Sequence, residues 1–163
     1  NKKLLEKIVR KITSVYSYRV NKYYLNGWIL YQTISSRLIG RSGYYQSGGA
    51  YGFRDQLQDT LGLKYINPEL LKKTNNKTRK HQFIEGDVLH WWHEETQRGI
   101  EQDLDDLLWL VYLTEECIDF TGDEETTNKK LHNLQGPILE EGKDERYDKY
   151  LESNIKVKYY KHV

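Results

Sequence analysis

The sequence contains few residues that cross-link or sharply bend a chain, with one cysteine and two prolines among 163 residues. The single cysteine, Cys117, excludes an internal disulfide and is typical of a reducing compartment. No apolar run approaches the roughly 18 residues that cross a bilayer, and the first residues lack the apolar core of a signal peptide. The net charge is only +1, which argues against nucleic acid and anionic membranes as partners. These absences indicate one polar domain, or a piece of a larger one, in the cytoplasm.

Aromatic residues with a polar edge are abundant, with 14 tyrosines and 4 tryptophans. Their rings have flat apolar faces, and their hydroxyl or indole N–H groups form hydrogen bonds. Both properties suit sugar binding, in which C–H faces stack on rings and hydroxyls find polar partners. They also suit ordinary half-buried packing, so the composition alone leaves both interpretations open.

Apolar residues recur at helical spacing along most of the chain, and no segment competes as an alternating strand. The predicted helices cover residues 4–12, 28–39, 53–65, 69–83, 105–121 and 145–159. Residues 72–80 contain no large apolar side chain, which predicts either a solvated helix or a poorly ordered connection. Residues 84–103 are predicted to form a long loop rich in functional side chains. The predicted fold class is therefore all-α.

The stretch 46–59 combines a glycine-rich loop with the start of a helix. Three closely spaced glycines predict turned backbone in its first half. An apolar stripe at i, i+4 and i+8 then begins at Phe53, and Arg54 and Asp55 lie off that stripe. A rigid pair of opposite charges beside a permissive loop suits a polyhydroxylated ligand. The alternative is an ordinary surface ion pair in the first turn of a helix.

Two further stretches carry candidate functional side chains. The run HWWH at 90–93 suggests either a metal site or an aromatic stacking platform. We favour the platform for sugars, because no third metal ligand stands at a recognisable spacing. Asp105 and Asp106 open a predicted helix, where carboxylates accept hydrogen bonds from free backbone N–H groups. Helix capping is therefore the structural alternative to a catalytic role for this pair.

Several motifs occur together in a characteristic order. They are NGWILYQT at 26–33, GYYQSGGAYGFRDQLQD at 43–59, HQFIEGDVLHWWH at 81–93, DDLLWL at 105–110, and LQGP at 134–137 followed by ERY at 145–147. This arrangement resembles the inverting glycoside phosphorylases of the cellobiose phosphorylase type. Within that group it is most similar to the phosphorylase domain of cyclic β-1,2-glucan synthases and to the 1,2-β-oligoglucan phosphorylases.

The resemblance implies a catalytic (α/α)6 barrel, of which residues 1–163 would be a single fragment, an incomplete toroid of antiparallel helix pairs. It implies that Asp105 is the general acid and that Arg54 and Asp55 hold hydroxyls of the transferred sugar. The other expected substrate-binding residues are Gln46, Trp91, Trp92 and His93. An inverting phosphorylase needs one acid to protonate the leaving oxygen, whereas phosphate is itself the nucleophile. We therefore expect no cofactor and no metal, with inorganic phosphate as co-substrate.

The leading prediction is inverting phosphorolysis or synthesis of a β-glucan, with β-1,2 linkages favoured, using glucose 1-phosphate. The expected partners are a β-linked gluco-oligosaccharide and phosphate, in the cytoplasm or in the cytoplasmic domain of a membrane-bound synthase. A fragment is expected to be inactive alone, to expose apolar surface and to self-associate. The alternative is a non-catalytic helical carbohydrate-binding remnant, because Leu104 stands where relatives have serine. A purely structural helical domain is a third interpretation.

Overall fold

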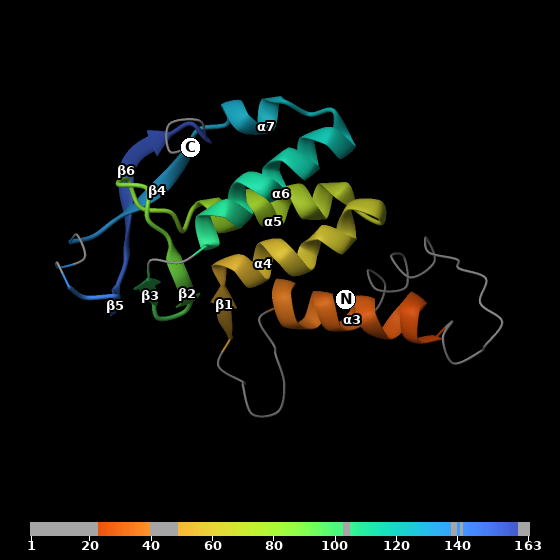
Figure 1. Ribbon diagram of the computed structural model, residues 1–163, viewed down its shortest axis with the longest axis horizontal. Coiled ribbons are helices and arrows are strands. Elements are labelled where there is room, and N and C mark those ends of the chain that lie inside the picture. Colours follow the sequence, from red (N-terminus) through yellow and green to blue (C-terminus); the bar gives the residue numbers. More distant parts are fainter. Residues whose placement is uncertain (1–22, 40–48, 103–104, 138–139, 141, 160–163) are drawn as a thin grey trace.

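Helices and two antiparallel sheets make up the chain in the computed structural model, which describes residues 23–39, 49–102, 105–137, 140 and 142–159. The all-α prediction and the incomplete toroid of helix pairs are therefore wrong. The predicted helix at 4–12 lies outside the described residues. Figure 1 shows the helices gathered on one side and the strands at one end of the helical layer. No described helix is long and apolar enough to cross a membrane.

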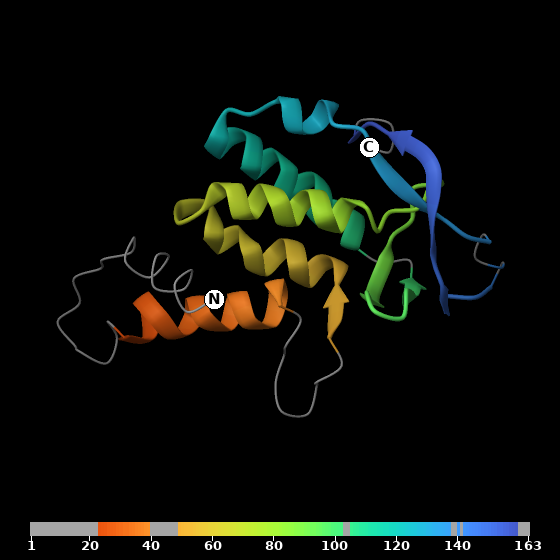
Figure 2. The ribbon, with the colours of Figure 1, turned by 180° about the vertical axis from the view of Figure 1, so that it is seen from behind.

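The helical part has three neighbouring helices at its centre, α4, α5 and α6, which contact one another pairwise. The described helices are η1 (Tyr24–Trp28), α3 (Ile29–Thr33), η2 (Ile34–Leu38), α4 (Phe53–Thr60), η3 (Leu61–Tyr65), α5 (Pro68–Arg79), α6 (Asp106–Thr121) and α7 (Glu125–Asn128). The segment from η1 to η2 lies along α4, as both views show (Figure 2). The predicted helices at 53–65 and 105–121 are confirmed by α4, η3 and α6.

The strands form one four-stranded and one two-stranded sheet. They are β1 (Ala50–Gly52), β2 (Leu89–His93), β3 (Arg98–Gln102), β4 (Leu131–Gln135), β5 (Glu145–Lys149) and β6 (Leu151–Val157). The larger sheet has the order β1-β2-β3-β5, and β4 pairs with β6. The predicted loop at 84–103 is therefore largely a hairpin, and the predicted helix at 145–159 is two strands. Both regions pair with segments that are distant in the sequence. The spacing of apolar residues within one region does not reveal such pairing.

The main core lies between α4, α5, α6 and one face of the larger sheet. Phe53 and Leu57, the first two residues of the predicted apolar stripe, are fully buried in it. Leu71, Leu113 and Trp92 pack in the same cluster from the two neighbouring helices and from β2. A smaller cluster joins the first helices to η3, with Leu30, Ile34, Leu63 and Ile66 as its buried members. The apolar stripe of α4 thus holds the sheet to the helices.

Helix α5 buries a polar face, contrary to the solvated or poorly ordered segment predicted for residues 72–80. Asn67 caps its first turn by accepting a hydrogen bond from Leu70 N at 3.2 Å. Asn75 is buried and donates to the Thr114 hydroxyl of α6 at 2.9 Å. Arg79 is buried and donates to the carbonyl oxygen of Lys129 at 2.7 Å. Carbonyl and hydroxyl oxygens on other elements accept hydrogen bonds from Asn75 Nδ2 and from the Arg79 guanidinium, whereas Asn75 Oδ1 is buried without a partner among the described residues.

His81 follows α5 and lies in the core with 9% of its surface exposed. Its ring stacks on the Trp92 indole with 3.8 Å between ring centroids. Its Nδ1 lies 3.1 Å from the Lys77 carbonyl oxygen, so Nδ1–H donates to this oxygen. Burial, which disfavours the charged imidazolium, lowers the pKa of His81 to about 4.

Acidification should therefore destabilise the fold through His81. In the unfolded chain its pKa returns to the ordinary value of 6.5, so the unfolded state binds more protons between that pH and about 4. The free energy of unfolding should fall by about 2–3 kcal/mol more between about pH 7 and about pH 4.5 in the wild type than in His81→Gln, which does not titrate. Urea unfolding at the two pH values measures this difference. Equal losses in both proteins would contradict it.

Candidate active site

The predicted acid and the predicted sugar-binding arginine meet at the helix starts. Arg54 stands in the first turn of α4, and Asp105 is the residue before α6. Arg54 Nη1 lies 2.9 Å from Asp105 Oδ2 and 3.3 Å from Oδ1. Both side chains are about half exposed, at 43% and 50%. The structure therefore joins two candidate residues that are 51 positions apart in sequence.

Trp109 and Gln58 complete this arrangement. The Arg54 guanidinium carbon lies 5.0 Å from the centroid of the Trp109 ring, within the range of a cation–π interaction. Trp109 Nε1 lies 3.4 Å from Asp105 Oδ2, and Arg54 Nε donates to Gln58 Oε1 at 3.1 Å. The sequence interpretation did not include Trp109. Its spacing of four residues from Asp105 was the available signal, because residues i and i+4 share a helix face.

Gly52 leaves room for Asp55 on the sheet face that carries Trp91. Gly52 and Trp91 are directly paired across β1 and β2, so a side chain at either position stands on the same sheet face. A Cβ atom at Gly52 would lie only 2.5 Å from Asp55 Oδ2. The Asp55 carboxylate therefore occupies the space that a side chain at position 52 would fill, on the sheet face that carries Trp91. Arg37 Nη1 lies 3.4 Å from the same carboxylate oxygen.

The two adjacent tryptophans lie on opposite faces of the sheet. Trp92 is 1% exposed and packs in the core between His81 and Tyr51. Trp91 is half-buried on the other face, where His93 meets it edge-on at 5.3 Å between ring centroids. Trp91 and His93 thus stand on one face of the sheet and Trp92 on the other, so one ring of the tryptophan pair packs in the core and the other stands away from it. Successive strand residues alternate between faces, which explains the difference. Gln46 lies outside the described residues.

Asp106 points into the protein and pairs with His90. Its side chain is 1% exposed, and its Oδ2 lies 2.8 Å from His90 Nδ1. The pairing of β2 with β3 shifts register between Leu89 and Trp91, so His90 occupies a bulge. Bulges re-aim side chains, and this one directs His90 toward the start of α6. Asp106 points inward, but its partner is an imidazole rather than a helix N–H group, and Asp105 at the N-cap position forms no side-chain capping hydrogen bond.

The site contains no metal cluster among the described residues, where no three His, Cys, Asp or Glu side chains gather to hold an ion. Its chemistry comes instead from a half-exposed carboxylate with a guanidinium, a second carboxylate on the sheet face that carries an indole, and a His90–Asp106 pair of which only the carboxylate is buried. Sugar hydroxyls can donate to Asp55 and Asp105 and accept from Arg54. The arrangement is suited to holding a pyranose close to a carboxyl group that can exchange a proton.

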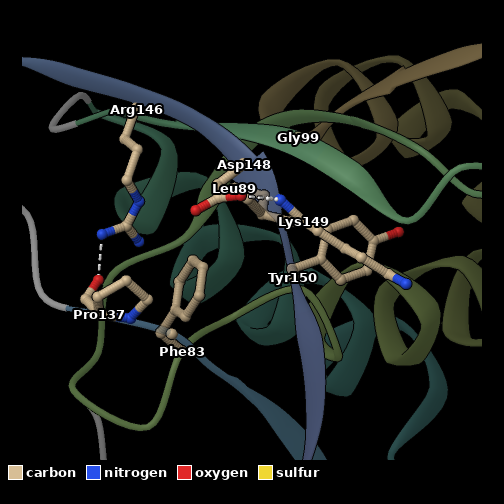
Figure 3. A pocket seen from close by; sticks show the side chains of 9 residues that line it. Phe83, Leu89, Gly99, Pro137, Arg146, Asp148, Lys149 and Tyr150 are labelled. Carbon is tan, nitrogen blue, oxygen red and sulfur yellow. Dashed lines mark hydrogen bonds between the residues drawn. The ribbon is translucent and has the colours of Figure 1, made fainter.

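A separate shallow hollow lies beside β5, between this strand and the segment after β4 (Figure 3). Phe83 and Leu89 line its apolar part, and Asp148 and Tyr150 contribute polar groups. Arg146 turns toward Pro137 and donates a hydrogen bond to its carbonyl oxygen. None of the residues predicted to bind substrate lines this hollow.

Comparisons with known proteins agree with the motifs. The family model described as "Glycosyl hydrolase 94 superfamily, catalytic domain" matches residues 7–162. The chain is also 38% identical over 132 residues to the cyclic beta-(1,2)-glucan synthase NdvB of Rhizobium meliloti (strain 1021). This match covers 80% of the chain but only 5% of the length of that relative.

The two adjacent carboxylates should differ in their effect on stability. Asp106→Ala removes a buried acceptor from His90 and should lower the free energy of unfolding by about 1–3 kcal/mol. Asp105→Ala removes a half-exposed ion pair and should cost less than about 1 kcal/mol. Urea unfolding of the two variants at one pH makes the comparison. Equal losses of unfolding free energy would show that the two carboxylates act together at the helix start. The contact of Asp106 with His90 would then be unimportant for stability.

Proposed function

The chain belongs to the glycosyl hydrolase 94 superfamily, and from this premise we propose that it forms part of an inverting glucosyl-transfer domain. The proposed reaction is reversible phosphorolysis of a β-1,2-linked glucan to glucose 1-phosphate. The name of the bacterial relative supports the linkage, and the family supports glycoside phosphorylase or glucan-synthesis chemistry. Because the chain spans about 5% of that relative, the activity of the whole protein is a proposal.

The contact between Arg54 and Asp105 is the observation that carries this proposal. It places one titratable carboxyl group at the surface of the site, while its neighbour Asp106 is withdrawn into the core. Inverting phosphorolysis requires one group that donates a proton to the departing glycosidic oxygen. Asp105 is the accessible member of the pair, so we assign it this role.

The bond changes follow from this assignment. A phosphate oxygen attacks the anomeric carbon from the face opposite the glycosidic bond. The carbon–oxygen bond to the leaving sugar breaks, and the proton of Asp105 passes to that oxygen. In synthesis, Asp105 takes a proton from the acceptor hydroxyl, and phosphate leaves. Phosphate is already anionic, so no second carboxylate is needed to activate it.

The other residues hold the sugar in this scheme. Asp55 accepts hydrogen bonds from hydroxyls of a ring that stacks on Trp91, and His93 lies against the same indole. Arg54 turns part of its donor array from Asp105 to the sugar as the ligand enters, which releases the carboxyl group for proton transfer. Inorganic phosphate is the co-substrate, no cofactor takes part, and the reaction occurs in the cytoplasm.

A non-catalytic carbohydrate-binding module is the second candidate. Its supporting observation is that Arg54 contacts both oxygens of Asp105 while Trp109 approaches one of them. A carboxylate held in this way can serve as a fixed part of a sugar-binding surface. The Asp55 and Trp91 contacts would be the same in both cases, so only turnover separates the two functions.

Asp105→Asn should reduce turnover by about 10²–10⁴-fold, the usual contribution of general acid catalysis, while glucan affinity stays close to that of the wild type. The assay measures glucose 1-phosphate released from β-1,2-linked oligoglucose and phosphate by the complete protein that carries this chain. Glu115→Gln, an exposed change on the same helix, is the matched control.

Two results would decide against catalysis by Asp105. Undiminished release by Asp105→Asn would remove it as the acid. Glucan binding without release by the wild-type protein would favour the non-catalytic module.

A further inference from the structure

The face of the larger sheet that carries Trp91 continues across two more strands. Trp91 is paired directly with Ile100 of β3, and Ile100 is paired directly with Tyr147 of β5. Directly paired residues stand on the same face of an antiparallel sheet. Gly52, Trp91, Ile100 and Tyr147 therefore form one row across the four strands.

The opposite face of the same strands confirms this orientation. Trp92 and Gly99, the next residues along β2 and β3, are buried toward the core. Asp148, which follows Tyr147, lines the hollow on that side (Figure 3). The Tyr147 ring thus stands on the face away from the helical core, and the residue is 49% exposed.

The two aromatic rings of the row approach each other across β3. Their centroids are 5.8 Å apart, and their planes are inclined by 35°. The Arg98 guanidinium carbon lies 5.9 Å from the centroid of the Tyr147 ring, so hydrogen-bond donors accompany the second ring. At the other end of the row, the Asp55 carboxylate stands over Gly52, the residue paired with Trp91.

The row therefore contains two rings in succession, each with a polar partner. Trp91 has the Asp55 carboxylate as an acceptor for hydroxyls, and Tyr147 has Arg98 as a donor. Pyranose rings present the same combination of an apolar C–H face and hydroxyls around the edge. One ring can hold one sugar unit, and two adjacent rings can hold two linked units.

We propose that Tyr147 and Arg98 form a second glucosyl-binding position, next to the position formed by Trp91 and Asp55. The outer face of the sheet then binds two consecutive glucosyl units of a β-glucan. This inference rests on the proposed function for the nature of the ligand. It has a specific consequence. Affinity for the sugar increases when a second glucosyl unit is present, and contact with Tyr147 causes the increase.

The test compares one sugar unit with two on the chain of 163 residues. Methyl β-glucoside and a β-1,2-linked glucose disaccharide are titrated separately, and aromatic side-chain NMR signals report binding. In the wild type, the glucoside should shift the signals of Trp91, whereas the disaccharide should shift those of Trp91 and Tyr147 and bind more tightly. This comparison needs no substitution, so it does not depend on the folding of a variant.

Variants then identify the ring that provides the increase. Tyr147→Ala should weaken disaccharide binding by roughly 3- to 10-fold, as expected for one lost aromatic contact, and leave glucoside binding unchanged. Tyr147→Phe keeps the ring and should bind like the wild type. Tyr65→Ala, which truncates a more exposed tyrosine on η3, is the matched control and should have no effect.

Three outcomes would overturn the proposal. They are a disaccharide that shifts no Tyr147 signal, equal affinities for the two ligands in the wild type, and an unchanged disaccharide affinity in Tyr147→Ala. If Trp91→Ala weakens glucoside binding in the same experiments, the first sugar position stands and only the second fails. The role of Asp105 is decided separately, by release of glucose 1-phosphate from the complete protein.

Discussion

The pairing of β1 with β2 is the contact on which the candidate site depends. Three residue pairs, Ala50 with His93, Tyr51 with Trp92 and Gly52 with Trp91, join the end of the glycine-rich stretch to the aromatic run. The pairing sets the start of α4 against the sheet, so that Phe53 enters the core. The absence of a side chain at Gly52 leaves the Asp55 carboxylate in place at the last pair, because a Cβ atom there would collide with it. A short strand thus determines where Arg54 and Asp55 of α4 lie.

Buried polar contacts specify much of the remaining structure. Asn75 joins α5 to α6, Arg79 joins α5 to the segment before β4, and Asp106 joins α6 to the bulge in β2. Each contact pairs one buried polar atom that would be costly to leave unpaired, although Asn75 Oδ1 and Asp106 Oδ1 have no partner among the described residues. A chain with few large apolar residues in α5 can still form a tightly packed helix layer by this means. The contact of Asp106 with His90 also holds the start of α6 close to the sheet.

The separation of Asp105 from Asp106 connects this framework to the family chemistry. Neighbouring residues at the start of a helix point in different directions, so one carboxylate meets Arg54 at the surface and the other meets His90 inside. A glycoside phosphorylase requires a single proton-exchanging group, and this geometry leaves one accessible. The aromatic row of the outer sheet face extends from the same place, beginning at Asp55 and Trp91. The residues proposed for catalysis and those proposed for sugar binding therefore share one scaffold.

Local patterns in the sequence determined the family, the helices at 53–65 and 105–121, and the candidate residues Arg54, Asp55, Trp91 and Asp105. Helix periodicity and contiguous motifs are properties of neighbouring residues, so they can be read without the fold. Tertiary structure alone decided that 145–159 forms strands, that Trp92 faces the core, and that His90 meets Asp106. These features depend on strand register and on partners up to several dozen residues away. A shift of one residue in register would exchange the faces of Trp91 and Trp92, and no local pattern records which register forms.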